Sequence, residues 1–243
     1  MNISLVWSFR NRLDLLRQSL KTAHTTCPKD VGFYLVDANS NYNYTIQELR
    51  YQLSQEILLD DHRKIHICET PYRSSLSEDW NFIIFVSSDV EFTSHAWWNN
   101  IMRGLQSNPY VLAGNHAVFG LNRQQMIKDV GWFDEGYTIG PHFDCDYMIR
   151  ASEAGIKVAN VGATGYTHHE KDGANARLEN DIPNRLPMHT KDNEVYFKKK
   201  WECSWPGWTR CSSPHPPTDI SQVSRKLPEI DPHPYWTRNI VNK

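Results

Sequence analysis

The stretch FIIFVSSDVE, residues 82–91, decides the expected fold of this chain. Its first five residues form the longest uninterrupted apolar run in the sequence and predict a buried strand. Polar residues, among them Asp89 and Glu91, follow at the point where this strand ends. A membrane-spanning helix needs about 20 apolar residues, so the run is too short for one and no transmembrane segment is expected.

Strands and helices alternate on either side of this stretch. Residues 3–8 and 32–36 predict two further buried strands, and leucines at helical spacing follow the first of them. Strands that alternate with helices form parallel sheets, so the first ~110 residues predict βαβ units. The remaining predicted elements are a helix that Ser94 caps and that extends to Leu105, helices over 44–58, 122–130, 144–154 and 193–201, and strands over 64–68, 111–119 and 156–161.

Polar side chains follow three of the predicted strands. Ser8 and Arg10 come after the first strand, and Asp37 and Asn39 come after the second. Asp89 follows the strand over 82–86. Ligands of parallel sheets bind beyond the carboxyl ends of the strands, so we expect these groups to converge on one crevice. The alternative is that each polar residue only begins a turn.

The chain lacks the glycine-rich loops that commonly hold phosphates. It contains no G-x-x-x-x-G-K-[ST] sequence, and no G-x-G-x-x-G follows the first predicted strand. A divalent metal is the usual replacement for neutralising a nucleotide diphosphate. Asp89 and Glu91 supply the oxygen ligands that such an ion prefers.

Composition sets limits on the class of protein. The 243 residues carry a net charge of −2, with 40% hydrophobic residues, which excludes a generally basic nucleic-acid coat protein and a disordered chain. Five cysteines, an odd number without a C-x-x-C pair, favour reduced thiols. With no signal peptide evident, we expect a cytoplasmic location. Nine tryptophans indicate either core packing or a surface that binds carbohydrate or bases.

Several blocks of sequence, in a fixed order, identify a family resemblance. They are VWSFRNR at 6–12, LVDANS at 35–40, IFVSSDVE at 84–91, GWFDE at 131–135 and FDCDYMIRASEAG at 143–155, with HH at 168–169 and YFKKKW at 196–201 behind them. Together they resemble the family 2, rhamnosyltransferase-like glycosyltransferases of the GT-A fold. Two positions depart from the family pattern: Ser87 replaces the first metal-binding acid, and Phe143 replaces a glutamate.

The resemblance implies an α/β protein with the GT-A fold, a Rossmann-like, mixed but mostly parallel sheet flanked by helices. It implies a catalytic domain over residues 1–202. Within it, residues 1–110 are the expected nucleotide-binding half and residues 111–202 the acceptor and catalytic half. Residues 203–243, rich in proline and tryptophan, form a C-terminal tail without a counterpart in the family.

The resemblance also implies a reaction, the inverting transfer of a sugar from a nucleotide diphosphate sugar to an acceptor hydroxyl. The expected general base is Asp144, with Asp146 second; helix capping is the alternative role for Asp144. Asp89, with His168 or His169, is expected to hold Mn²⁺ or Mg²⁺. A histidine ligand favours Mn²⁺. For the two histidines, an ordinary exposed loop pair is the alternative.

The resemblance assigns the remaining site residues to the nucleotide and the acceptor. The residues expected at the nucleotide are Ser8, Arg10, Asp37, Asn39, Arg73 and Ser88. Among them Asp37 contacts the base, and Arg73 either reaches a phosphate or is solvated. Trp132 and Phe133 are expected to form an acceptor wall, with core packing as the alternative.

The identities of donor and acceptor stay open at this level. The donor is expected to be a UDP-, GDP- or dTDP-sugar, and the acceptor a glycan. A nucleic-acid hydroxyl is the second acceptor class, because aromatic and basic residues mix in the tail. The competing functions are a non-catalytic nucleotide-sugar or glycan-binding module and a metal-dependent nucleotidyltransferase, which would release pyrophosphate.

Overall fold

The computed structural model describes residues 2–9, 13–37, 53, 65–68, 80–131, 133, 143–169, 195, 197 and 200. The chain divides into two compact units. The first unit consists of Met1–Gln124 and Ala159–Ala174, and the second of Gln125–Val158 and Asn175–Lys243. Among the described residues, no helix is both long and apolar enough to cross a membrane.

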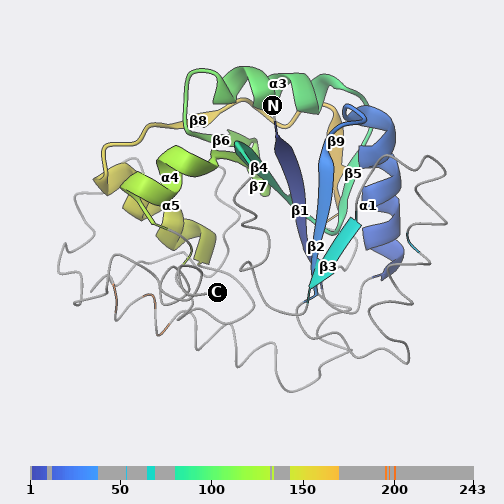
Figure 1. The fold of residues 1–243 in the computed structure, drawn as a ribbon, viewed down its shortest axis with the longest axis horizontal. Helices are drawn as coiled ribbons and strands as arrows, with labels where there is room; N and C mark the ends of the chain where they lie inside the picture. The colour runs from blue at the N-terminus through green and yellow to red at the C-terminus, as the bar shows by residue number, and fades with distance from the viewer. Residues whose placement is uncertain are drawn as a thin grey trace. The chain divides into compact units, whose positions relative to one another are not determined.

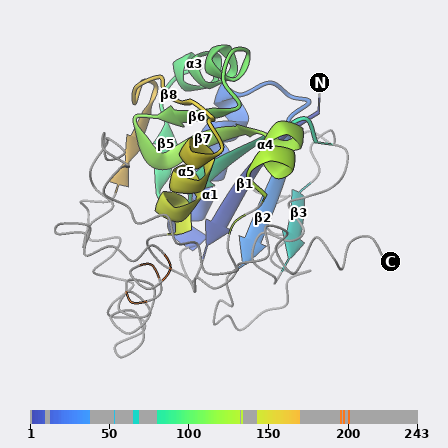
Figure 2. The same cartoon turned by 90° about the vertical axis from the view of Figure 1, so that its left-hand side faces the viewer.

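The main sheet has seven strands in the order β3-β2-β1-β4-β7-β6-β8 (Figure 1). The strands are β1 (Ile3–Phe9), β2 (Gly32–Asp37), β3 (Ile65–Cys68), β4 (Phe82–Ser87), β6 (Tyr110–Ala113), β7 (Asn115–Asn122) and β8 (Val158–Asn160). The first four run parallel, and the arrows of β1, β2 and β3 point the same way in Figure 2. The β7 strand is antiparallel to both β4 and β6. The predicted mixed, mostly parallel sheet is therefore confirmed.

The prediction of one strand over 111–119 is wrong. Two strands, β6 and β7, occupy this region, and the chain reverses between them at Gly114. Gly114 has a φ of 80°, which residues with a Cβ adopt only at a cost. A Cβ at this position would also lie 2.5 Å from Cβ of Ala163. The polar Asn115 and His116 that follow Gly114 fitted the mixed alternation of a single strand, so the pattern did not show this reversal.

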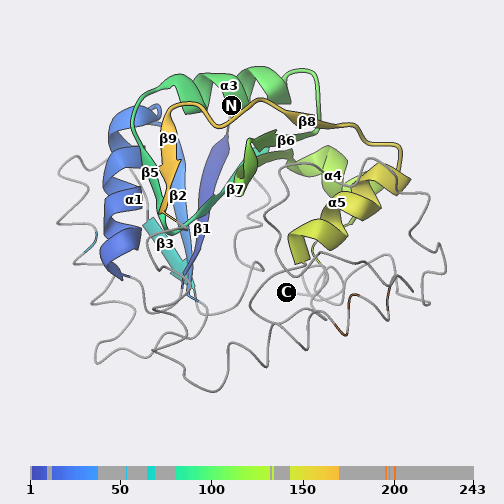
Figure 3. The ribbon, with the colours of Figure 1, turned by 180° about the vertical axis from the view of Figure 1, so that it is seen from behind.

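A second, two-stranded sheet lies directly after β4 in the chain. It pairs β5 (Val90–Phe92) with β9 (Tyr166–His168) in antiparallel register, and the two strands run side by side in Figure 3. In this register Val90 stands opposite His168. The pairing brings the residues after β4 next to a segment that follows much later in the sequence.

The helices of the first unit bury their apolar stripes against these sheets. They are α1 (Leu13–Thr26) and α3 (Ala96–Leu105). Trp7 of β1 is fully buried and donates its indole N–H to Ser19 Oγ of α1 at 2.9 Å. Trp97 of α3 is also fully buried and donates to Thr26 Oγ1 at the same distance. For these two tryptophans, core packing is confirmed, and each indole N–H has the partner it needs.

Two further helices continue the chain. They are α4 (Arg123–Asp129) and α5 (Phe143–Glu153). The α5 helix ends in a Schellman motif, in which Ile156 N–H donates to Ala151 O at 2.9 Å and Gly155 N–H donates to Ser152 O at 3.0 Å. Gly155 has a φ of 75°, as this motif requires. The predicted stop of the helix at this glycine is confirmed.

Parts of the prediction lie outside the described residues. Of the helix predicted over 44–58, only Leu53 is described, and it is helical. Of the helix predicted over 193–201, Val195, Phe197 and Lys200 are described, and all three are helical. The tail over 203–243 lies entirely outside the described residues.

Candidate active site

The carboxyl ends of the parallel strands meet at one edge of the sheet. Ser8 near the end of β1 is in register with Ser87 of β4 on one side and with Val36 of β2 on the other. Phe9 is in register with Asp37, the last residue of β2. Polar residues from three strands therefore reach the same level, where ligands of such sheets bind.

Not every residue expected at the nucleotide is described. Ser8 and Ser88 are half-buried at or near this edge. The backbone of Asp37 lies there too, but its side chain lies outside the described residues, and so do Arg10, Asn39 and Arg73. Their contacts with a nucleotide therefore stay predictions.

A carboxylate and an imidazole meet just beyond the end of β4. Asp89 lies in the turn between β4 and β5, and its Oδ1 is 3.2 Å from Nε2 of His168 at the end of β9. Both side chains are slightly less than one-fifth exposed, so the pair is accessible but not freely solvated. Two ligands about 2.1 Å from one ion and at right angles lie roughly 3 Å apart. The observed separation thus fits two neighbouring ligands of a divalent metal.

His169 faces a different carboxylate. Its Nε2 lies 3.0 Å from Oε2 of Glu91, whose Oε1 accepts a hydrogen bond from Gln18 Nε2 of α1 at 3.1 Å. The backbone N–H of His169 also donates to the carbonyl oxygen of Asp89 at 3.0 Å. These contacts tie the end of β9 to β5 and α1.

The predicted metal residues are thus only partly brought together. Asp89 meets His168, whereas His169 pairs with Glu91. Among the described residues, no three His, Cys, Asp or Glu side chains form a group that could hold a metal. The described residues therefore offer a pair of candidate ligands at this place, Asp89 and His168, and the metal site stays a prediction.

The two predicted catalytic carboxylates lie in the first turn of α5, within the second unit. Asp144 is 8% exposed, and its Oδ1 accepts the backbone N–H of Cys145 at 2.9 Å. Asp146 is fully buried, with Oδ2 2.9 Å from Arg150 Nε and Oδ1 2.6 Å from Lys200 Nζ. Both oxygens of Asp146 are therefore engaged by cations.

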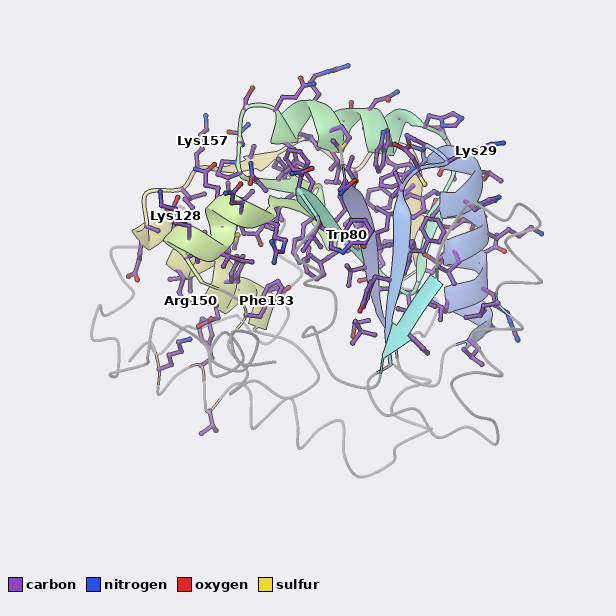
Figure 4. The ribbon with its side chains drawn as sticks, in the orientation of Figure 1. Lys29, Trp80, Lys128, Phe133, Arg150 and Lys157 are labelled. Atoms are coloured by element: carbon purple, nitrogen blue, oxygen red, sulfur yellow. The ribbon has the colours of Figure 1, made fainter. Side chains whose placement is uncertain are left out.

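Packing around α5 fixes the segment before it. Tyr147 is fully buried and donates its hydroxyl to Gly131 O at 3.1 Å, and burial raises the pKa of this phenol despite the nearby Arg150 cation. Phe133 is buried, with its ring 4.5 Å from the Tyr147 ring. Figure 4 shows Phe133 and Arg150 beside α5. Phe133 thus takes the core role, whereas Trp132, the other residue of the expected acceptor wall, lies outside the described residues.

Sequence reasoning assigned no role to Lys200, Gln18 or the salt bridge of Arg150. The four-residue spacing between Asp146 and Arg150 on a predicted helix was a readable signal for that ion pair. No local pattern marks Lys200 as the partner of Asp146, because three adjacent lysines occur at 198–200.

Comparisons with known proteins identify the fold. No protein-family model matches the chain, and no curated protein matches it in sequence. Among solved structures, TarS of S. aureus aligns over 81% of this chain with a TM-score of 0.53 and 13% identity. The mannosyltransferase PcManGT of Pyrobaculum calidifontis, in complex with GDP-Man and Mn²⁺, aligns over 66% of this chain with a TM-score of 0.50 and 11% identity.

A third solved structure widens the range of activities that share this fold. The 4-diphosphocytidyl-2C-methyl-D-erythritol synthase of Anaerococcus prevotii aligns over 73% of this chain and 96% of its own, with a TM-score of 0.50 and 12% identity. The chain spans only 43% of TarS and 55% of the mannosyltransferase chain. These similarities confirm the GT-A fold, and activity is a separate inference.

Proposed function

We propose that this protein is an inverting, metal-dependent glycosyltransferase that moves a sugar from a nucleoside diphosphate sugar to an acceptor hydroxyl. The observation that carries the proposal is the contact between Asp89 and His168 directly after β4 of a GT-A sheet. This is the edge of a parallel sheet at which nucleotides bind. The mannosyltransferase that shares the fold was solved with GDP-Man and Mn²⁺, which supports the same donor chemistry here.

Asp89 and His168 are the proposed metal ligands, through Oδ1 and Nε2. A divalent ion bound there would supply positive charge to the leaving diphosphate. An imidazole ligand suits Mn²⁺ better than Mg²⁺, so we propose Mn²⁺ as the working ion. His169 contacts Glu91, which accepts a hydrogen bond from Gln18, and this favours His168 as the ligand of the two histidines.

Asp144 is the proposed general base. It would take the proton from the acceptor hydroxyl while the hydroxyl oxygen attacks the anomeric carbon and the bond from that carbon to the diphosphate breaks. Asp146 is less suited to this role, because it is fully buried and two cations occupy its oxygens. Asp144 keeps 8% exposure whereas Asp146 has none, which favours Asp144 of the two.

The donor and acceptor classes complete the proposal. We propose a UDP-, GDP- or dTDP-sugar as donor, with Ser8, Arg10, Asp37, Asn39, Arg73 and Ser88 at the nucleotide. A glycan hydroxyl is the proposed acceptor. We propose a cytoplasmic location, because five cysteines without a C-x-x-C pair favour reduced thiols.

A nucleotidyltransferase is the second candidate function. A synthase named for a diphosphocytidyl product shares the fold and is covered almost completely by this chain. The same carboxylates and metal would then serve attack on a phosphorus atom, with pyrophosphate as the leaving group. The two functions therefore differ in the product released from the nucleotide.

A donor screen tests the proposal. UDP-, GDP- and dTDP-sugars are each incubated with the protein, with Mn²⁺ or EDTA, and nucleoside diphosphate and pyrophosphate are measured separately. We expect nucleoside diphosphate from one nucleotide class, only with metal, and not from the Asp144→Asn variant. In parallel incubations with a nucleoside triphosphate and a sugar 1-phosphate in place of the nucleotide sugar, release of pyrophosphate would favour the nucleotidyltransferase. Tight nucleotide binding without any turnover would favour a non-catalytic module.

A further inference from the structure

A buried ion cluster joins α5 to a segment far along the chain. Asp146, fully buried, contacts Arg150 Nε at 2.9 Å and Lys200 Nζ at 2.6 Å. Lys200 is itself only 2% exposed. A lysine ammonium is almost never buried to this extent without a partner, so the position of Lys200 depends on this carboxylate.

The cluster belongs to the same helical turn as the proposed base. Asp144 and Cys145 immediately precede Asp146, and all three side chains are buried. Arg150, the second cation, also donates to Val130 O at 3.0 Å. Lys200, in contrast, lies far beyond the end of α5 in the sequence. Its ion pair with Asp146 is a long-range charged contact of this turn.

We propose that Lys200 is a positioning residue that holds the first turn of α5 through Asp146 and thereby sets the place of Asp144. The kinetic part of this inference rests on the proposed glycosyl transfer, whereas the structural part does not. In this account Lys200 must contact Asp146 for the base to take its working position. Losing the ammonium removes a cation from a buried carboxylate, which favours opening of the turn.

Cys145 offers a direct reporter of this opening. It forms no disulfide, is 1% exposed and lies between the two aspartates. A thiol reagent can modify it only when the turn opens, so its labelling rate measures the population of the open state. Cys27, which also forms no disulfide and is buried in the first unit, reports on unfolding elsewhere in the same molecule.

The test compares N-ethylmaleimide labelling of the full-length wild type, Lys200→Met and Lys128→Met, with each cysteine followed by peptide mass spectrometry. Lys128 lies exposed on α4, so its substitution is the matched control. We expect Lys200→Met to label Cys145 about tenfold faster, with Cys27 unchanged and Lys128→Met like the wild type. An unchanged Cys145 rate, or equal acceleration of both cysteines, would overturn the proposal. If Lys200→Met does not fold, Lys200→Gln is judged by the same rates.

The second part of the test measures kcat and the donor KM of the same variants, with a donor that the wild type turns over. Lys200→Met is expected to lower kcat about tenfold with little change in the donor KM, and Lys200→Arg to recover part of the loss. An unchanged kcat beside accelerated labelling would contradict the positioning role. If the wild type turns over no donor, glycosyl transfer fails as a function, while the labelling rates still decide whether Lys200 holds the turn.

Discussion

His168 Nε2 lies 3.2 Å from Asp89 Oδ1, although the whole of α4 and α5 separates the two residues in the sequence. The contact depends on the antiparallel pairing of β5 with β9, in which Val90 lies opposite His168. A backbone hydrogen bond from His169 to Asp89 extends this pairing by one residue. A carboxylate at the end of a parallel strand thus gains an imidazole neighbour, and the metal proposal follows from this geometry.

Removing His168 should weaken metal binding far more than removing its neighbour. We expect His168→Ala to lower the affinity for Mn²⁺ in the presence of nucleotide by about 100-fold, because one of two protein ligands is lost. Free Mn²⁺ measured by electron paramagnetic resonance gives this affinity without any turnover.

His169→Ala is the matched control for this variant, since His169 pairs with Glu91 rather than Asp89. We expect His169→Ala to lower the affinity for Mn²⁺ by about tenfold, against about 100-fold for His168→Ala. Equal losses in the two variants would refute the assignment of His168 as the ligand.

Replacing the proposed base should affect chemistry and spare binding. Asp144→Asn keeps the shape of the side chain and removes its ability to accept a proton, so we expect kcat to fall by about 10²- to 10⁴-fold. Donor affinity, measured by isothermal titration calorimetry, should change little. Asp129→Asn, at an exposed position of α4, is the control and should keep full activity. Full activity of Asp144→Asn would remove Asp144 from the mechanism.

Alkaline pH should destabilise the fold in part through Tyr147. Burial raises the pKa of its phenol above the ordinary value of 10.0, so above that pH the unfolded chain loses a proton that the folded protein keeps. The free energy of unfolding therefore falls as pH rises, by at most about 1.4 kcal/mol per pH unit for this group. Urea unfolding at pH 9, 10 and 11 should show a shallower decline for Tyr147→Phe. Parallel declines for the two proteins would show that Tyr147 does not contribute.

Two glycines with positive φ give a matched pair for testing the fold. The Cβ that Gly155→Ala adds has no atom within 4 Å. We therefore expect the free energy of unfolding to fall only by the cost of a left-handed backbone conformation, about 1 kcal/mol. Gly114→Ala has the same backbone cost and also places a Cβ 2.5 Å from that of Ala163. Its loss of unfolding free energy should exceed that of Gly155→Ala by about 1–3 kcal/mol in urea titrations. A reversed order would contradict the described β6–β7 turn.

Local sequence patterns predicted the central strands and the end of α5, because these features depend on residues that are close together in the sequence. Apolar runs predicted the central strands, and Gly155 marked the end of α5. The same patterns missed the reversal at Gly114, since apolar residues over 110–113 and 117–119 with two polar residues between them also suit the mixed alternation of a single strand.

Contacts between distant residues were beyond those patterns. Whether Asp89 meets His168 or His169 depends on the register of β9 against β5, and a shift of one residue would exchange the two histidines. The choice of Lys200 as the partner of Asp146 depends on the packing of a later helical segment. Ion pairs between residues far apart in the sequence leave no periodic pattern in it, so only the three-dimensional structure identifies the partners.

The central claim concerns which bond of the donor breaks. The reaction is run with Mn²⁺ and the donor selected by the screen, Mn²⁺ is then removed on a chelating resin, and phosphorus nuclear magnetic resonance identifies the phosphate product. Glycosyl transfer predicts that the donor signals are replaced by those of a nucleoside diphosphate, with no sugar phosphate signal, and that the donor signals stay unchanged when EDTA is present during the reaction. The appearance of a sugar 1-phosphate in place of the nucleoside diphosphate, or donor signals that persist unchanged after the reaction with Mn²⁺, would contradict the account.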